Sequence, residues 1–117
     1  MPLIFSERWG TSTRVAVWSA EEDQDYFLDR LDLTADDLAL VRSMHPRRAL
    51  EWCASRYLLA RMIGRERARR CTKDDHGKPV IPGDAIELSI SHSYGMAAVI
   101  VSDRHRVGID VQRQTSK

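Results

Sequence analysis

The sequence predicts an α+β domain in which a small antiparallel sheet packs against one long helix. Apolar runs of β-prone residues occur near both ends of the chain, at 14–18 and 96–102, and are short enough to be strands. Between them, a helical stretch begins at Pro46 and ends at Gly64. The 117 residues predict a single domain, 1–117, with its own core.

The first third of the chain predicts two strands followed by a helix. The strands lie at 3–7 and 14–18. Ser19 and Glu22 then form a capping-box pattern, in which each side chain bonds to a backbone N–H of the first helical turn. This pattern predicts a helix through Leu31 that buries aromatic side chains.

A further helix is predicted to begin at Thr34, a preferred capping residue with two aspartates in the turn that follows. The main helix is predicted to begin at Pro46, because proline suits the first turn of a helix. Gly64 ends the main helix. The remainder predicts a small antiparallel sheet with strands at 71–73, 86–90, 96–102 and 107–112.

The main helix has two chemically different sides. On a helical projection, apolar side chains gather on the side expected to meet the sheet: Leu50, Cys53, Ala54 and Tyr57. Arg48, Trp52 and Arg56 recur at intervals of four on the other side. Taken alone, this second group is typical of a solvated basic stripe, with Trp52 lying over the arginine stems.

Composition excludes several classes of protein. Eighteen Lys and Arg stand against seventeen Asp and Glu, so the near-neutral chain lacks the general basic surface of a nucleic-acid-binding protein. Cys53 and Cys71 fit neither a disulfide framework nor a zinc motif and are expected to be free thiols. Residues 1–8 do not resemble a signal peptide, and no stretch is apolar enough to span a membrane, so a cytoplasmic protein is expected.

The strand predicted at 107–112 carries a candidate metal site. Side chains alternate along a strand, so Gly108, Asp110 and Gln112 share one face. A carboxylate and an amide oxygen beside a glycine suit a hard cation such as Mg²⁺, which takes one or two carboxylates together with substrate oxygens. The same pattern also fits an ordinary half-exposed strand.

Two polar clusters precede this strand. In Gly77-Lys78-Pro79, a tight turn with a stiff exit presents one positive charge that suits a phosphate, although a plain surface turn has the same composition. In Ser91-His92-Ser93, two hydroxyls flank an imidazole at a strand end and are able to bind phosphate oxygens. Neighbouring side chains of an extended chain point apart, which disfavours a serine–histidine hydrolase.

In this order and spacing, the clusters resemble those of the phosphopantetheinyl transferases, in particular the two-domain type that activates carrier proteins. Members of that family carry a Gly-Lys-Pro turn, a Ser-His-Ser strand end and a Gly-Ile-Asp strand, which here correspond to 77–79, 91–93 and 108–110. The stretch 48–56 is similar to the family's arginine-rich helix with an internal glutamate. The resemblance implies a phosphopantetheinyl transferase-like half-domain.

The resemblance also implies a reaction: Mg²⁺-dependent transfer of 4′-phosphopantetheine from coenzyme A to a serine of an acyl or peptidyl carrier protein. Asp110 and His92 are implied as catalytic residues, and Asp110 with Gln112 as metal ligands. The implied coenzyme A contacts are listed together: Arg48 and Arg56 on the 3′-phosphate, Lys78 and Pro79 at the adenine, and Ser91, His92 and Ser93 on the phosphates.

Two departures from the family pattern keep other functions open. Gln112 stands where many members have Glu, and no match follows it to the second half of the family enzymes, which supplies a further metal carboxylate and a catalytic lysine. The sequence therefore predicts an N-terminal half that is inactive alone and pairs with itself or with a second-half polypeptide. A non-catalytic domain that binds coenzyme A or another nucleotide, and a structural partner module, remain as alternatives.

Overall fold

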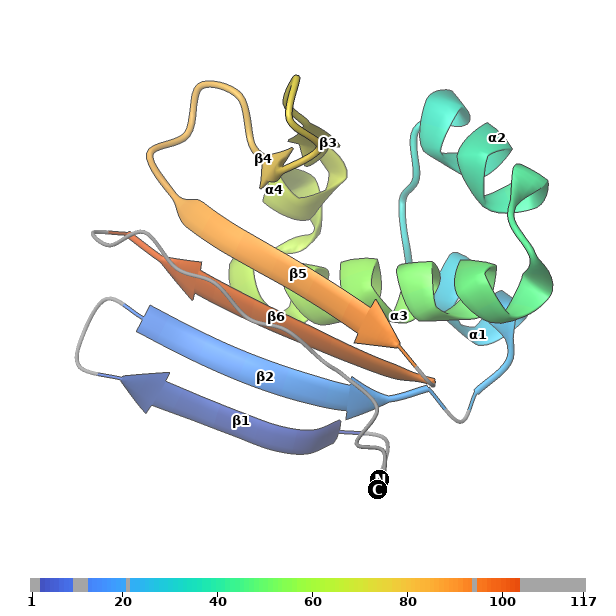
Figure 1. Ribbon diagram of the computed structural model, residues 1–117, viewed down its shortest axis with the longest axis horizontal. Coiled ribbons are helices and arrows are strands. Elements are labelled where there is room, and N and C mark those ends of the chain that lie inside the picture. The colour runs from blue at the N-terminus through green and yellow to red at the C-terminus, as the bar shows by residue number, and fades with distance from the viewer. Residues whose placement is uncertain (1–2, 10–12, 21, 94, 104–117) are drawn as a thin grey trace, which may run out of the picture.

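The protein was analysed as a computed structural model, which describes residues 3–9, 13–20, 22–93 and 95–103. The main sheet is antiparallel, with strand order β1-β2-β6-β5 (Figure 1). Its strands are β1 (Leu3–Trp9), β2 (Thr13–Ser19), β5 (Glu87–Ser93) and β6 (Met96–Ser102). The predicted α+β class, with a helix packed on an antiparallel sheet, is confirmed.

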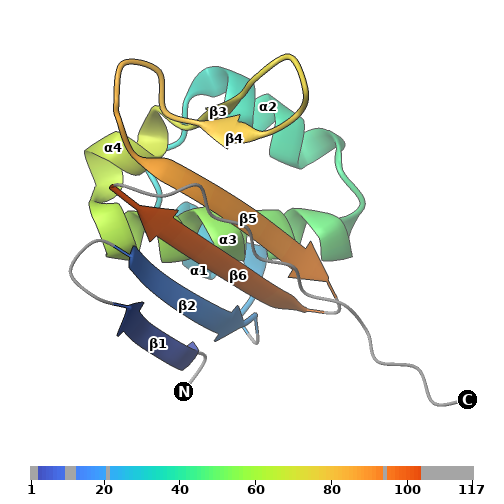
Figure 2. The same ribbon diagram turned by 60° about the vertical axis from the view of Figure 1, so that its left-hand side comes forward.

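The long helix α3 (Pro46–Ile63) lies across one face of the sheet and contacts β2, β5 and β6 (Figure 1). Three shorter helices surround it: α1 (Gln24–Leu28), α2 (Ala35–Ser43) and α4 (Arg65–Arg69). Strands β3 (Thr72–Lys73) and β4 (Pro79–Val80) form a separate two-stranded sheet, which lies beside β5 (Figure 2).

The helix boundaries follow the sequence signals in two of three cases. Thr34 caps α2, its hydroxyl accepting from the Asp37 amide at 3.1 Å, as predicted. Pro46 occupies the first turn of α3, and Gly64 ends it with a φ of +97°, a backbone conformation that favours glycine. The sequence did not predict α4, which starts directly after this glycine.

The capping box predicted at Ser19 and Glu22 is wrong. Ser19 is the last residue of β2, and Asp23 caps α1 by accepting from the Tyr26 amide at 3.0 Å. Glu22 instead accepts from Trp18 Nε1 at 3.3 Å. The aromatic side chains of α1 are nevertheless used as expected, because Phe27 is buried edge-on against Trp18.

The sheet differs from the predicted one in its members. The strand predicted at 71–73 is not part of the main sheet but pairs with β4 in the separate two-stranded sheet. The main sheet instead includes β1 and β2. The strand predicted at 107–112 lies outside the described residues. The predicted bounds of β6 are confirmed, and this central strand is buried along both faces from Ala97 to Ser102.

The helical projection of α3 was only half right. Cys53 and Ala54 are fully buried, as predicted, but so are Trp52 at 5% and Arg56 at 8% exposure. The projection placed these two in solvent because it considered only the sheet. On its second side, α3 contacts α4, and Arg56 also contacts Cys71, whereas Arg48 on the same side is exposed.

No helix within the described ranges combines the length and apolar character needed to cross a bilayer.

Candidate functional site

His92, near the end of β5, lies at the centre of the candidate site. Its ring nitrogen Nδ1 is 3.2 Å from Glu51 Oε1 on α3, and the other carboxylate oxygen accepts from the Gly95 amide at 2.8 Å. The Glu51 side chain is 9% exposed and that of His92 is 22% exposed. The imidazole is therefore held at Nδ1 by Glu51, and part of its surface remains accessible to a ligand.

One open cleft of about 470 Å³ lies on the side of His92 that faces the start of α3. Its described lining residues are His45, Arg47, Arg48, Glu51, His92 and Ser93. His45 caps α3, with its Nδ1 accepting from the Arg47 amide at 3.3 Å. We call this space the first cleft; it combines two arginines with the N-terminus of a long helix, both of which favour an anion.

A second, narrower cleft of about 120 Å³ lies on the other side of the same imidazole. Its described lining residues are Trp52, Ser55, Arg56, Lys73, Gly77, Pro79, Ile90 and His92. Together, the linings of the two clefts contain four arginine and lysine residues and one carboxylate, that of Glu51. This excess of positive charge suits a polyanionic ligand that extends past His92 on both sides.

Arg56 is a buried cation without a carboxylate partner among the described residues. Its guanidinium lies 4.8 Å from the centre of the Trp52 ring, and Nη1 donates to Cys71 Sγ at 2.6 Å. Burial raises the pKa of the Cys71 thiol, and the nearby Arg56 opposes that shift without reversing it. A neutral thiol leaves the positive charge of Arg56 uncompensated.

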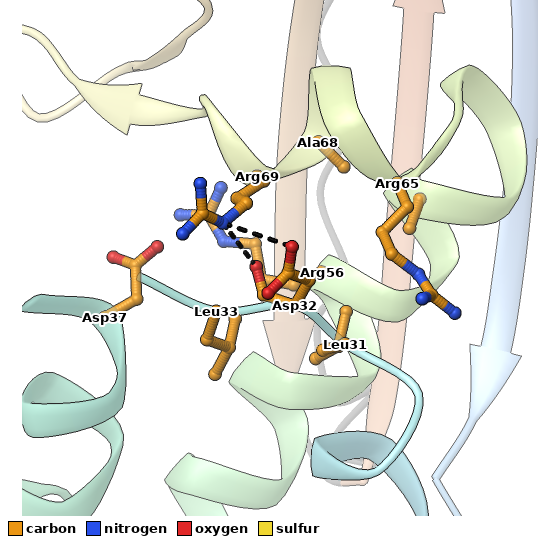
Figure 3. Close-up of a pocket in the computed structure, with 9 residues that line it drawn as sticks. Leu31, Asp32, Leu33, Asp37, Arg56, Arg65, Ala68 and Arg69 are labelled. Atoms are coloured by element: carbon orange, nitrogen blue, oxygen red, sulfur yellow. Dashed lines mark hydrogen bonds and ion pairs between the residues drawn. The ribbon is translucent and has the colours of Figure 1, made fainter. Parts of the chain in front are cut away.

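Arg56 also lines a small pocket together with Asp32, Asp37 and Arg69 (Figure 3). The Nε of Arg56 is nevertheless buried and has no hydrogen-bond partner in the described part of the chain. Asp32 is engaged by Arg69, whose Nε lies 3.4 Å from Asp32 Oδ2. A buried guanidinium without a paired carboxylate reduces the stability of the fold, but at the wall of a cleft it is well suited to bind an anion.

Only two of the three residues of the Gly-Lys-Pro turn line a cleft. Asp74 Oδ1 accepts from the His76 and Lys78 amides, both at 2.9 Å, and Gly77 adopts a φ of +79°. These two amides lower the pKa of Asp74. Gly77 and Pro79 line the second cleft, whereas Lys78 Nζ pairs with Glu87 at 2.9 Å and lines neither cleft.

The other predicted ligands are divided. Ser93 lines the first cleft, whereas Ser91 lines neither cleft. Asp110 and Gln112 lie outside the described residues. Within the described ranges, no three His, Cys, Asp or Glu side chains gather in a way that could hold a metal ion.

Among the acidic, basic and histidine side chains that line the clefts, four were not assigned a role from the sequence: His45, Arg47, Glu51 and Lys73. Glu51 had a recognisable signal, because an acidic residue between Leu50 and Trp52 on a helix with a buried side needs a partner. Lys73 had none, since only the pairing of β3 with β4 brings it next to Arg56.

Comparison with protein families gives one match. A model of the 4′-phosphopantetheinyl transferase N-terminal domain matches residues 36–102, which is more than half of the chain. The matched range contains every described residue that lines the two clefts. A search of curated proteins finds no match. The chain therefore belongs to the 4′-phosphopantetheinyl transferase family, of which it carries the N-terminal domain.

Proposed function

We propose that this chain provides the coenzyme A site of an enzyme that transfers 4′-phosphopantetheine, in a Mg²⁺-dependent reaction, to a serine of an acyl or peptidyl carrier protein in the cytoplasm. Family membership supports the transferase class. The observation that carries the proposal is the position of His92, where two cationic clefts meet. Coenzyme A has a 3′-phosphate and a 5′-diphosphate, so a site with separated cation groups fits its charge distribution.

The proposed contacts follow from the linings of the clefts. Arg48 lies in the first cleft and Arg56 in the second, so each arginine would neutralise a different part of the ligand. His92 would bind a phosphate oxygen between them, with the Ser93 hydroxyl beside it. These groups hold and orient the diphosphate, which is the part of coenzyme A where a bond to phosphorus breaks.

The adenine would lie against Pro79, with Lys78 at its edge. Lys78 reaches the ligand only by leaving Glu87, and both side chains of that pair are about two-fifths exposed, at 40% and 38%. An exposed ion pair of this kind contributes about 0–1 kcal/mol, so its loss is a small cost compared with a contact to a phosphate.

Asp110 and Gln112 are the proposed magnesium ligands, because carboxylate and amide oxygens are donors that Mg²⁺ accepts. The ion would neutralise charge on the diphosphate oxygens. Ser91, the remaining predicted ligand, lines neither cleft and would reach the phosphates only from outside them. Removal of the proton from the carrier serine is assigned to the family's second half, as the resemblance implies.

Isothermal titration calorimetry of the 117-residue chain with coenzyme A, with and without Mg²⁺, tests the proposal. Arg48→Ala should weaken binding by about 10-fold or more, the effect of a lost charged hydrogen bond. Arg42→Ala is the matched control, because Arg42 is an exposed arginine in the last turn of α2 and lines neither cleft. Dephospho-coenzyme A, which lacks the 3′-phosphate, should bind more weakly than coenzyme A.

The outcomes separate three functions. Binding strengthened by Mg²⁺ supports the transferase site. An affinity for coenzyme A that is the same with and without Mg²⁺ but is lowered by Arg48→Ala indicates a non-catalytic nucleotide-binding domain. No binding at millimolar coenzyme A, from a folded chain, contradicts both and leaves a structural partner module.

A further inference from the structure

Glu51 uses both of its carboxylate oxygens within the protein. Oε1 contacts His92 Nδ1 at 3.2 Å, and Oε2 accepts from the Gly95 amide at 2.8 Å. The residue is 7% exposed and lies in the middle of a helix whose neighbouring positions, Trp52 and Cys53, are core residues. A buried carboxylate at this position is costly unless its partners need it.

The contact with Glu51 decides which nitrogen of His92 carries a proton. An ionised carboxylate only accepts hydrogen bonds, so Nδ1 must be the protonated nitrogen of the neutral ring. The remaining nitrogen, Nε2, then carries a lone pair, and His92 lines both clefts. A lone pair repels a phosphate oxygen, so His92 binds a phosphate only after Nε2 also takes up a proton.

We propose that Glu51 is the positioning residue of His92, which fixes the imidazole in its Nδ1–H form and makes phosphate binding at Nε2 depend on the uptake of a proton. The inference deepens the proposed function and rests on it for the identity of the ligand. Glu51 does not contact the ligand in this account. It acts through His92, as the carboxylate partner of a metal-bound histidine acts through its ring.

The charges around His92 determine the direction of this effect. Glu51 on α3 favours the doubly protonated ring. The basic side chains of the two clefts oppose it while the clefts hold no anion: His45, Arg47 and Arg48 in the first, and Arg56 and Lys73 in the second. A bound phosphate cancels that opposition, so the proton and the anion bind together.

A purely structural role for Glu51 is the alternative. The Gly95 turn is held from two directions, because the Gly95 carbonyl also accepts from the Ala20 amide at 2.6 Å. Glu51 would then only fix this turn to α3. Glu51→Gln distinguishes the two roles, because the amide keeps the size of the side chain and one acceptor oxygen for Gly95.

The same substitution reverses the hydrogen bond to His92. In E51Q, the new side-chain amide nitrogen donates, so it requires a lone pair on Nδ1 and moves the ring proton to Nε2. Long-range ¹H–¹⁵N NMR of the ligand-free chain at pH 8 identifies the protonated nitrogen. We expect Nδ1–H in the unmodified chain and Nε2–H in E51Q, with His92→Gln used to assign the signals.

Proton uptake is measured by titrating coenzyme A in buffers of different ionisation enthalpy. At a pH where the NMR spectrum of the ligand-free chain shows a singly protonated His92 ring, we expect about one proton to be taken up per ligand. Above that pH, affinity should fall about tenfold per pH unit. In E51Q, the neutral Nε2–H donates directly, so proton uptake and this pH dependence should disappear; His92→Gln should abolish both as well.

Glu66→Gln is the matched control, since Glu66 is an exposed acid in the first turn of α4 and lines neither cleft. It should retain the Nδ1–H ring and the proton uptake. An Nε2–H ring in the unmodified chain, or an Nδ1–H ring with unchanged proton uptake in E51Q, overturns the inference. If coenzyme A does not bind, the proposed function fails, and the NMR result alone decides whether Glu51 fixes the ring.

Discussion

Replacing Arg56 with methionine should increase the stability of the domain and remove a positive charge that its ligand site needs for binding. Arg56 is 8% exposed, has a buried Nε without a partner in the described part of the chain, and donates only to a thiol there. An unsatisfied buried donor costs about 1–3 kcal/mol, and an apolar residue of similar shape removes that cost. The lost contact with the Trp52 ring offsets about 1 kcal/mol of the gain.

The expected net effect of Arg56→Met is an increase of about 0–2 kcal/mol in the free energy of unfolding, or roughly 4 °C in melting temperature per kcal/mol. Urea denaturation followed by tryptophan fluorescence measures it, with an unchanged m-value as evidence that the denatured state is the same. Sulfate should raise the melting temperature of the unmodified chain by occupying the cationic clefts, and should do so less for the variant.

Arg70→Met is the control for this experiment, because Arg70 is exposed at the end of α4 and should change the free energy of unfolding by less than about 0.5 kcal/mol. A destabilisation by Arg56→Met of more than about 1 kcal/mol, in a folded variant, would refute the reasoning. It would mean that the guanidinium is satisfied within the domain and that no anion is needed to explain it.

The remaining predictions concern titration. Arg67 binds both oxygens of Asp84, at 2.9 and 3.0 Å, and lowers the pKa of that carboxyl. Asp84→Asn should therefore destabilise the domain by about 1 kcal/mol at pH 7, and the difference should vanish as the pH falls through the lowered pKa, because both forms are then neutral; a difference that persists in acid would contradict this. Burial raises the pKa of Cys53 to about 11, so the unfolded thiol ionises first and stability should fall as the pH rises between about 9 and 11. Cys53→Ser should reduce that alkaline loss, leaving the part that comes from the buried Cys71 thiol, and alkylation with iodoacetamide at pH 8 should be slow until the chain unfolds.

The parts of the fold that could be predicted are those with local signals. Thr34, Pro46 and Gly64 act through local chemistry, namely a capping hydroxyl, a fixed φ and access to a positive φ, and the structure places helix ends at all three. Strand β6 was predicted with its observed bounds because a strand buried on both faces is a continuous apolar run. The capping box at Ser19 was incorrect because Asp23 is the N-cap, and Glu22 instead contacts Trp18.

The site was harder to predict because its burial is set by distant segments. A helical projection treats one side of α3 as solvent, but Cys71 and the β3–β4 pair cover Arg56 there. The same packing brings Lys73 to the second cleft, while the ion pair with Glu87 holds Lys78 away. The assignments of Asp110 and Gln112 to a metal site remain predictions.

The order of strands in the main sheet places the strand that contributes to the clefts at one edge and the N-terminal strand at the other. Every described residue that lines a cleft lies between His45 and Ser93, and β5 contributes at one edge of the sheet. Strand β1 lies at the other edge, with β2 and β6 between (Figure 1). Strand β1 is therefore the strand of the main sheet farthest from the clefts, so relatives that share the ligand chemistry should vary most in their first strand.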